Sequence, residues 1–139
     1  EAEWEYAARA GSVAPFHFGE LADSSRGNFR GLYPRDRKDV PDTENTYGTK
    51  PVGTYEPNAY GLFDVHGNVG EWSLETYNGR LAGGAVTDPK PREGGNRATV
   101  RGGTWEDSAV RVRASAREGV GKSTQSNVIG FRVFLAPEK

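Results

Sequence analysis

The hydrophobic and polar positions at the start of the chain follow the period of an α-helix. Trp4, Ala7 and Ala8 recur at the i, i+3 and i+4 spacing that places side chains on one helix face. Glutamates precede Arg9, which suits the helix dipole, and Gly11 is typical of the residue that follows a helix C-terminus. The pattern therefore predicts a helix that ends near Gly11. Because a chain seldom starts inside so complete a helix, we expect a fragment or a processed product.

Three stretches in the last third of the chain have the pattern of β-strands. Over residues 110–117, valine and alanine occupy the even positions, and arginine and serine occupy the odd ones. Shorter β-favouring runs at 99–101 and 131–135 border glycines. We expect a strand in each of these three stretches.

The remaining segments are mostly polar and have no sustained period. Residues 12–50 and 78–97 have the composition of loops, and glycines divide the segment 51–72. A structureless stretch as long as 12–50 is usually functional, disordered or tied to a ligand. Its carboxylates and amides leave two alternatives, a site for a hard cation and a plain solvated loop.

Composition narrows the class of protein. The 139 residues include 18 Lys or Arg and 19 Asp or Glu, for a formal net charge of −1, which argues against a nucleic-acid or membrane-surface binder. No apolar run is long enough for a membrane span or a signal peptide, and the compartment stays open. Cysteine is absent, which excludes a disulfide scaffold, a thiolate metal site and a cysteine nucleophile in this chain.

We expect a folded domain with a small, aromatic-rich core. Leu, Ile, Val and Phe together number only 25, but the charge is near zero and 11% of the residues are aromatic. The 19 glycines and 8 prolines predict many loops and turns. Without disulfides, such a domain is commonly stabilised by bound metal.

Two acidic residues form a candidate metal site. Asp64 and Glu71 are separated by Gly67 and Gly70, which would let backbone carbonyls and both carboxylates converge. Calcium binds about six to eight oxygen ligands of these kinds. The spacing is not that of an EF-hand, so a calcium site and a turn with exposed acids both remain open.

The two histidines, His17 and His66, offer little chemistry by themselves. Without cysteine they cannot build a typical structural zinc site. We interpret His66 as a turn or surface residue rather than a catalytic base. The common serine-hydrolase and phosphate-loop motifs do not occur.

The odd positions of the predicted strand 110–117 form an arginine face. Arg111, Arg113 and Arg117 could hold an anionic ligand through bidentate contacts, or they could form a solvated face that pairs with nearby acids. The polar stretches 105–111 and 118–127 are either recognition loops or plain connectors.

Six blocks, taken in order, resemble the formylglycine-generating enzyme (sulfatase-modifying factor) family. They are EAEWEYAAR at 1–9, PVG at 51–53, PNAYGLFDVHGNVGEW at 57–72, RGGTW at 101–105, RASAR at 113–117 and IGFR at 129–132. The resemblance implies an α+β, C-type-lectin-like fold, loop-rich and with a small antiparallel sheet. It also implies a single domain over residues 1–139 that lacks the N-terminal part of the family domain.

The resemblance further implies one or two calcium ions. One ion would be held by Asp64, the carbonyls of Gly67 and Val69, and Glu71. The other would be held by Asn28, the Phe29 carbonyl, Glu44 and the Thr46 carbonyl.

The catalytic chemistry of the family depends on two copper-binding cysteines between the RGGTW-type and RASAR-type blocks. The corresponding stretch, 105–113, is shorter here and holds no cysteine. Because copper(I) selects thiolate ligands, we expect no copper. The histidine iron ligands that related sulfoxide synthases take from another domain are absent too. The resemblance therefore points to the non-catalytic branch, which includes domains fused to kinases or caspase-like proteases and the variable proteins of diversity-generating retroelements.

In those variable proteins, the residues between the RGGTW-type and GFR-type blocks form a ligand-binding surface. The corresponding residues here are Trp105, Glu106, Asp107, Ser108, Val110, Arg111, Val112, Arg113, Ser115, Arg117, Glu118, Lys122 and Asn127. We expect a non-catalytic domain that binds a protein, a small ligand or other domains of a larger parent chain. The alternative is an oxidoreductase that converts a sulfatase cysteine to formylglycine together with parts missing here.

Overall fold

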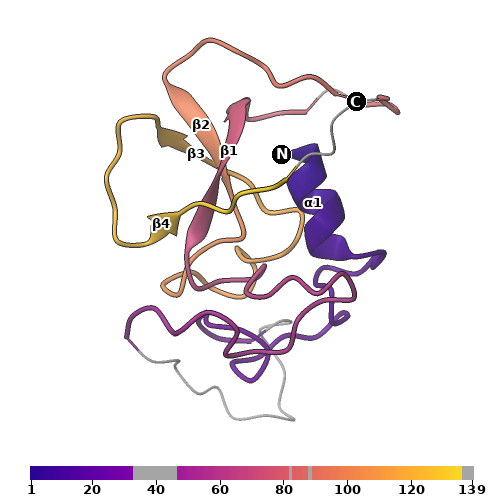
Figure 1. The fold of residues 1–139 in the computed structure, drawn as a ribbon, viewed down its shortest axis with the longest axis vertical. Helices are drawn as coiled ribbons and strands as arrows, with labels where there is room; N and C mark the ends of the chain where they lie inside the picture. The colour runs from indigo at the N-terminus through magenta and orange to yellow at the C-terminus, as the bar shows by residue number, and fades with distance from the viewer. Residues whose placement is uncertain (33–46, 82, 88, 136–139) are drawn as a thin grey trace.

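The computed structural model describes residues 1–32, 47–81, 83–87 and 89–135, and Figure 1 shows their arrangement. The elements are α1 (Ala2–Arg9), β1 (Gly70–Thr76), β2 (Arg97–Arg101), β3 (Glu118–Gly121) and β4 (Ile129–Gly130). The sheet lies beside α1 in the upper part of Figure 1, and the described loops between α1 and β1 lie in the lower part together with the turns that follow β2. None of the described helices is long and apolar enough to cross a membrane.

The predicted N-terminal helix is confirmed. Trp4 and Ala8 are its buried residues, as the hydrophobic period indicates. Ala10 adopts the left-handed conformation with φ 46°, and its N–H donates to the Tyr6 carbonyl. Gly11 follows at φ 88°, where a glycine avoids the steric cost that a side chain would impose.

The sheet is mixed, so the expectation of an antiparallel sheet is wrong at one edge. The strand order is β3-β2-β1-β4, and β1 pairs with β2, and β2 with β3, in antiparallel fashion. Strand β4 instead runs parallel to β1, with Gly70 opposite Ile129 and Glu71 opposite Gly130. Parallel neighbours need a long connection between them, and here that connection contains β2 and β3.

Of the three predicted strands, one is confirmed and two are wrong. Strand β2 contains residues 99–101, but residues 110–117 form successive turns and residues 131–135 continue past β4 as irregular chain. The Arg111 N–H donates to the Ser108 carbonyl and the Ala116 N–H to that of Arg113, so local turns satisfy groups that a strand would offer to a neighbour. The alternation still reports burial correctly, because Val112 and Ala114 are buried.

Among the described residues the core is small, as the composition predicts, and it is divided into two clusters. One cluster joins the N-terminal loops to the turns after β2 and contains Phe16, Ala22, Phe29, Ala109 and Val112. The other packs α1 against the segment before β1 and contains Trp4, Ala8 and Val65. The turns at 105–117 are therefore anchored on buried side chains.

Candidate ligand-binding groove and metal sites

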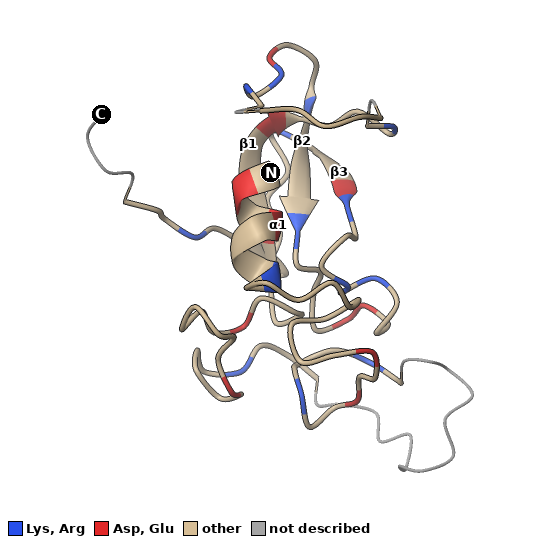
Figure 2. Cartoon of the chain, turned by 90° about the vertical axis from the view of Figure 1, so that its right-hand side faces the viewer, with Lys and Arg blue, Asp and Glu red and all other residues tan. Residues whose placement is uncertain are grey.

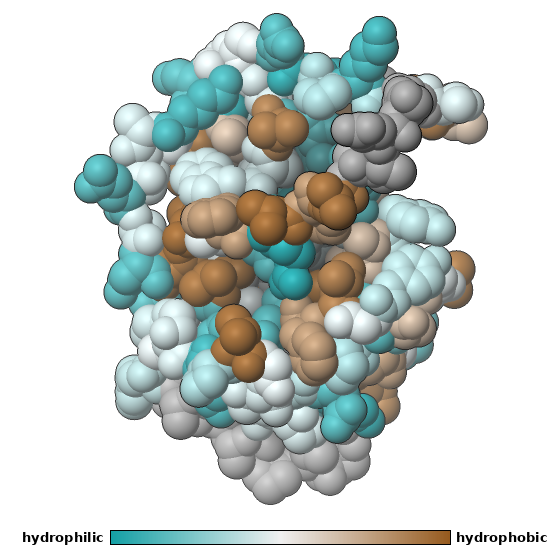
Figure 3. Space-filling model, in the orientation of Figure 1, coloured by the Kyte–Doolittle hydropathy of each residue, from teal (hydrophilic) through white to brown (hydrophobic). Residues whose placement is uncertain are grey.

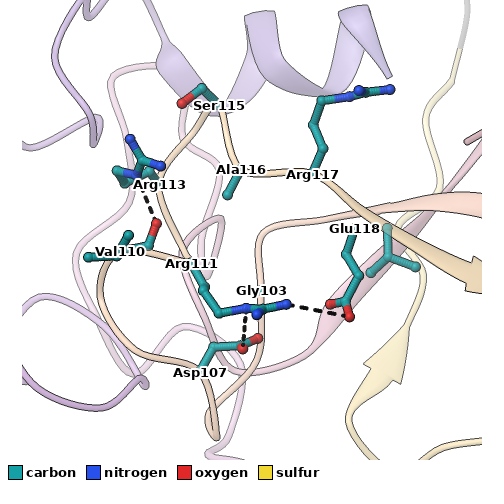
Figure 4. Close-up of a pocket in the computed structure, with 10 residues that line it drawn as sticks. Gly103, Asp107, Val110, Arg111, Arg113, Ser115, Ala116, Arg117 and Glu118 are labelled. Atoms are coloured by element: carbon teal, nitrogen blue, oxygen red, sulfur yellow. Dashed lines mark hydrogen bonds and ion pairs between the residues drawn. The ribbon is translucent and has the colours of Figure 1, made fainter. Parts of the chain in front are cut away.

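The turns after β2 and the start of β3 enclose an open groove of about 380 Å³, here named the arginine groove (Figure 4). Its lining residues are Val100, Gly103, Asp107, Val110, Arg111, Arg113, Ser115, Ala116, Arg117 and Glu118. Seven of the thirteen predicted ligand-binding residues thus come together around one hollow. Ligand binding by this stretch stays a prediction.

Arg111 crosses the arginine groove between two acidic residues (Figure 4). Its Nε lies 3.1 Å from Asp107 Oδ1, and its Nη2 lies 3.6 Å from Glu118 Oε1. Asp107 is itself fixed, since its Oδ2 accepts from the Thr104 N–H at 3.0 Å. Both the Arg111 and the Glu118 side chains are exposed, and exposed ion pairs contribute about 0–1 kcal/mol each. A ligand can therefore displace Arg111 at low cost.

Arg117 lines the arginine groove, but its guanidinium is bonded to other parts of the fold. Its guanidinium donates to the Glu1 carboxylate and to the Asn78 carbonyl, and it lies 5.2 Å from the centre of the Tyr77 ring. The hydrogen bond with Glu1 raises the pKa of Arg117 above its usual value. Every edge of this guanidinium is engaged, so it has little capacity left for a ligand.

Arg113 and Ser115 carry the free polar groups of the groove wall. The Arg113 Nε donates to the Val110 carbonyl at 2.8 Å. Its two terminal nitrogens and the Ser115 hydroxyl have no hydrogen-bond partner among the described residues. These groups, together with the displaceable Arg111, are the ones that a ligand can address.

Trp105 lies outside the groove lining but on the adjoining surface. The Arg30 guanidinium is 5.8 Å from the Trp105 ring centre and 6.0 Å from that of Tyr47. The cation of Arg30 therefore contacts the faces of two aromatic rings. Glu106 and Ser108 belong to the same turn, and Ser108 forms a β-bridge with Arg30.

Three predicted binding residues are placed elsewhere. Val112 is 0% exposed and packs with Phe16 and Phe29, so its assignment to a binding surface is wrong. Lys122 and Asn127 do not line the groove. Lys122 follows β3, and its ammonium lies 3.3 Å from the carbonyl of Gly94, a residue that precedes β2.

The first predicted calcium site contains a carboxylate that is already fully bonded. Glu71 is buried, and its Oε2 accepts from the Trp4 indole N–H at 2.6 Å. Arg132 donates to both oxygens, with Nη2 2.6 Å from Oε1 and Nε 3.0 Å from Oε2. Asp64 Oδ2 accepts from the Gly53 N–H at 2.8 Å. A calcium ion here would have to replace bonds from a guanidinium, so this arrangement of Glu71 does not fit the ion.

The backbone around this set is nevertheless unusual. Asp64, Gly67 and Asn68 have φ angles of 55°, 86° and 66°, in the left-handed region that costs energy for residues other than glycine. A Cβ at Gly67 would collide with the Asn28 backbone carbonyl. The glycine is therefore required by the close approach of the two loops.

The second predicted calcium site has free oxygens. Asn28 is buried, its Nδ2 donates to the Gly48 carbonyl at 3.0 Å and to Asn68 Oδ1 at 3.1 Å, and its own Oδ1 has no hydrogen-bond partner. Within the described part of the chain the Phe29 carbonyl accepts no hydrogen bond either. Buried oxygens without partners are costly, and a hard cation would satisfy both. The other expected ligands, Glu44 and Thr46, lie outside the described residues.

Acidic side chains alone do not make a metal centre in the described ranges, which hold no group of three or more His, Cys, Asp or Glu side chains able to bind one ion. A calcium site built on Asn28 would rest on amide and carbonyl oxygens, which calcium accepts readily.

His66 is buried, so its interpretation as a turn or surface residue is wrong. It is 3% exposed, its Nε2 accepts from the His17 backbone N–H at 3.1 Å, and its Nδ1 lies 2.7 Å from the Val112 carbonyl. Nδ1 therefore carries the proton. Burial lowers the pKa of His66 to about 3, with further lowering by His17 and Arg9. Two histidines 49 residues apart give no sequence signal of this contact.

A second buried polar group was missed as well. Arg101 is fully buried, and its Nη2 donates to Glu5 Oε2 at 2.5 Å and to the Ala114 carbonyl at 2.8 Å, while Nη1 donates to the Ala116 carbonyl. The guanidinium also lies 5.1 Å from the Trp4 ring centre. Burial lowers the pKa of Arg101, and Glu5 opposes that effect. This residue ties α1 and β2 to the wall of the arginine groove.

The short helix, the small mixed sheet and the long anchored loops define a domain of the formylglycine-generating enzyme type. The chain belongs to the family described as the sulfatase-modifying factor enzyme 1-like domain, whose sequence profile matches residues 1–137. The resemblance noted in the sequence is thereby confirmed at the level of the family and the fold.

The chain is similar both to proteins named as formylglycine-generating enzymes and to proteins named as inactive members of that group. A formylglycine-generating enzyme of Thermomonospora curvata is 34% identical over 99% of this chain and 48% of its own length. The inactive C-alpha-formylglycine-generating enzyme 2 of Mus musculus is 31% identical over 95% of this chain and 40% of its own length. The chain thus spans less than half the length of these curated relatives.

Two solved structures share the fold. PvdO from Pseudomonas aeruginosa matches with a TM-score of 0.74 and 29% identity, over 94% of this chain and 48% of that one. Treponema denticola variable protein 1 matches with a TM-score of 0.64 and 23% identity, over 94% of this chain and 44% of that one. The second likeness concerns the fold alone.

Proposed function

We propose that this domain is a non-catalytic binding module that receives a protein or small ligand in the arginine groove. The observation that carries the proposal is the make-up of the groove. The stretch 105–113, where the oxidases of the family hold copper, contributes Asp107, Arg111 and Arg113 and no thiol. Copper(I) needs soft ligands, whereas these side chains suit hydrogen bonding and ion pairing.

The rigid base of the groove supports a recognition role. Val112 and Ala114 are buried, and Arg101 holds the Ala114 and Ala116 carbonyls from below. The exposed Arg111 and the half-buried Arg113 therefore project from a fixed backbone. Binding residues on an anchored scaffold lose less conformational freedom when a ligand arrives.

We also propose that calcium stabilises the scaffold, with Asn28 Oδ1 and the Phe29 carbonyl among its ligands. The unpartnered, buried oxygens support this assignment. The ion would supply no chemistry to the groove. It would fix the loops that approach each other at Gly67 and Asn28.

An assay for oxidation tests the non-catalytic assignment. The purified chain, incubated with copper and a cysteine-containing peptide, should consume no oxygen above a protein-free control. Thiol-dependent oxygen consumption would favour the alternative function, that of an oxidoreductase. The similarity to a formylglycine-generating enzyme is the reason for testing this alternative.

A matched pair of variants tests the groove. Arg113→Ala removes the guanidinium whose two terminal nitrogens are unpaired at the wall, and Arg92→Ala removes an exposed arginine outside the lining. A ligand retained by the wild type and by Arg92→Ala should be lost by Arg113→Ala, and weakened by Arg111→Ala and Trp105→Ala. Equal retention by all variants would place binding on another surface.

A further inference from the structure

Among the charged residues that line the arginine groove, Arg113 alone has no oppositely charged partner in the described part of the chain. The two acids of the lining both pair with Arg111, and Arg117 pairs with Glu1. Arg113 forms no ion pair with any described residue. It is nevertheless half-buried, so its charge loses part of its hydration without an anion in return.

The Arg113 guanidinium is held in one orientation by its own turn. Its Nε donates to the Val110 carbonyl at 2.8 Å, and the two terminal nitrogens stay free. Two parallel N–H groups of this kind match the two oxygens of a carboxylate. The hydroxyl of the exposed Ser115 is also free, and Figure 4 shows it in the same part of the groove as the Arg113 guanidinium. Three hydrogen-bond donors are therefore available to one anion.

The other charges of the groove favour a ligand with a single negative charge. Asp107 and Glu118 line the same hollow and would repel further negative charge. Figure 2 shows acidic and basic positions interspersed from the start of β3 into the turns below it, not the basic surface that attracts a polyanion. A carboxylate carries one charge at neutral pH, whereas a phosphate monoester carries about −1.5 to −2.

A second groove, of about 500 Å³, offers no comparable cation. Figure 3 shows hydrophobic residues grouped across the middle of one face of the molecule, and the wall of this groove is mainly apolar, with Val52, Leu62, Phe63, Val69 and Phe131. Its arginine, Arg132, already binds the Glu71 carboxylate. An anionic ligand is therefore matched better by the arginine groove.

We infer that the arginine groove recognises a single carboxylate group, bound by the terminal nitrogens of Arg113 and the hydroxyl of Ser115. This assignment rests on the proposed binding function and adds the chemical group that the groove selects. Val110 and Ala116 also line the groove and give short apolar surface for the stem that carries the carboxylate. An acidic side chain of a polypeptide and a small free acid both have this chemistry, and separate probes distinguish them.

Titration of the isotopically labelled chain, followed by NMR at constant ionic strength, tests the inference. The probes are the peptide acetyl-Gly-Val-Glu-Val-Gly-amide, the same peptide with glutamine in place of glutamate, sodium propionate and methyl phosphate. The amide signals of Arg113 and Ser115 should shift with the glutamate peptide, with a millimolar dissociation constant, and should not shift with the glutamine peptide. Methyl phosphate should bind more weakly than either carboxylate. Equal affinity for propionate and the glutamate peptide would assign a small acid, and tighter binding of the peptide would assign a polypeptide.

Four variants complete the test. Arg113→Gln should weaken binding of the glutamate peptide at least about tenfold, because it removes the charge-assisted bonds. Ser115→Ala should weaken it by a smaller factor. Glu118→Gln should tighten it about two- to threefold, because a repelling charge is removed, and a purely structural role of these residues would give no such gain. Arg92→Gln, outside the lining, should bind like the wild type.

Ser115 and Glu118 are exposed, so their variants keep the test valid if Arg113→Gln does not fold. The inference is wrong if the two peptides shift the Arg113 and Ser115 signals equally, if methyl phosphate binds more tightly than both carboxylates, or if no carboxylate shifts these signals. The first two results would leave the groove as a binding site for other chemistry. Thiol-dependent oxygen consumption would instead contradict the proposed function itself.

Discussion

The guanidinium of Arg132 binds both oxygens of the Glu71 carboxylate, across 61 residues of sequence. Glu71 also accepts the indole N–H of Trp4. One buried carboxylate therefore joins α1, β1 and the segment after β4. The family blocks at 1–9, 57–72 and 129–132 each contribute one of these residues, so their joint occurrence has a structural reason.

Removing the cation from this pair should cost more stability than removing the anion. Arg132→Gln leaves a buried carboxylate without its counter-charge, which costs about 3 kcal/mol. Glu71→Gln leaves Arg132, which is partly exposed, and keeps an acceptor for Trp4, so we expect a loss of about 1–2 kcal/mol. Urea denaturation measures both. Equal losses, or a double variant no more stable than Arg132→Gln, would contradict this account.

Arg101 should not be replaceable by lysine. Its planar fork reaches Glu5 and the carbonyls of Ala114 and Ala116 together, whereas a lysine ammonium cannot span all three. Arg101→Lys leaves at least one buried carbonyl unpaired and should lower the free energy of unfolding by about 1–3 kcal/mol. Arg92→Lys, at an exposed position, is the control and should be neutral. A neutral Arg101→Lys would show that water replaces the lost bonds.

The sequence predicted those elements whose determinants lie within the element itself or next to it in the chain. Helix α1 has its period, charges and terminal glycine within eleven residues, and β2 has β-favouring residues beside a glycine. The turns at 110–117 have the alternation of a strand because Val112 and Ala114 are buried. However, the Pro15 carbonyl and local carbonyls accept the backbone N–H groups. Strand β1 was missed because the glycines before it resemble a loop.

The candidate site likewise contains residues that the sequence predicted and contacts that it did not. The residues of the arginine groove are close in sequence, and the family resemblance brought most of them together. Arg101 was missed, and the partners of Glu71 and His66 could not be found, because charged and polar residues are ordinarily at the surface and these partners lie far away in the chain. Pairing between distant buried polar groups leaves no periodic signal.

Calcium should raise the thermal stability of the domain. An ion that binds the native state alone, at about a hundred times its dissociation constant, adds about 2.7 kcal/mol, so a chelator should lower the melting temperature by several degrees. Asn28→Ala should abolish this calcium-dependent increment, and Asn127→Ala, at an exposed position, should keep it. Loss of the increment in Asp64→Asn instead would assign the ion to the Asp64 set, and insensitivity of the wild type to the chelator would remove calcium altogether.

Acid should destabilise the domain through His66. Burial lowers the pKa of His66 to about 3, below the value of about 6.5 expected in the unfolded chain. Its contribution to stability is therefore complete above pH 6.5 and is lost as the pH falls towards 3, with a slope of up to about 1.4 kcal/mol per pH unit. Protonated Nε2 could no longer accept the His17 N–H. Unfolding free energies measured by urea from pH 7 to 4 should fall less steeply in His66→Gln than in the wild type, because glutamine does not titrate. Parallel curves would assign the acid sensitivity to carboxylates instead.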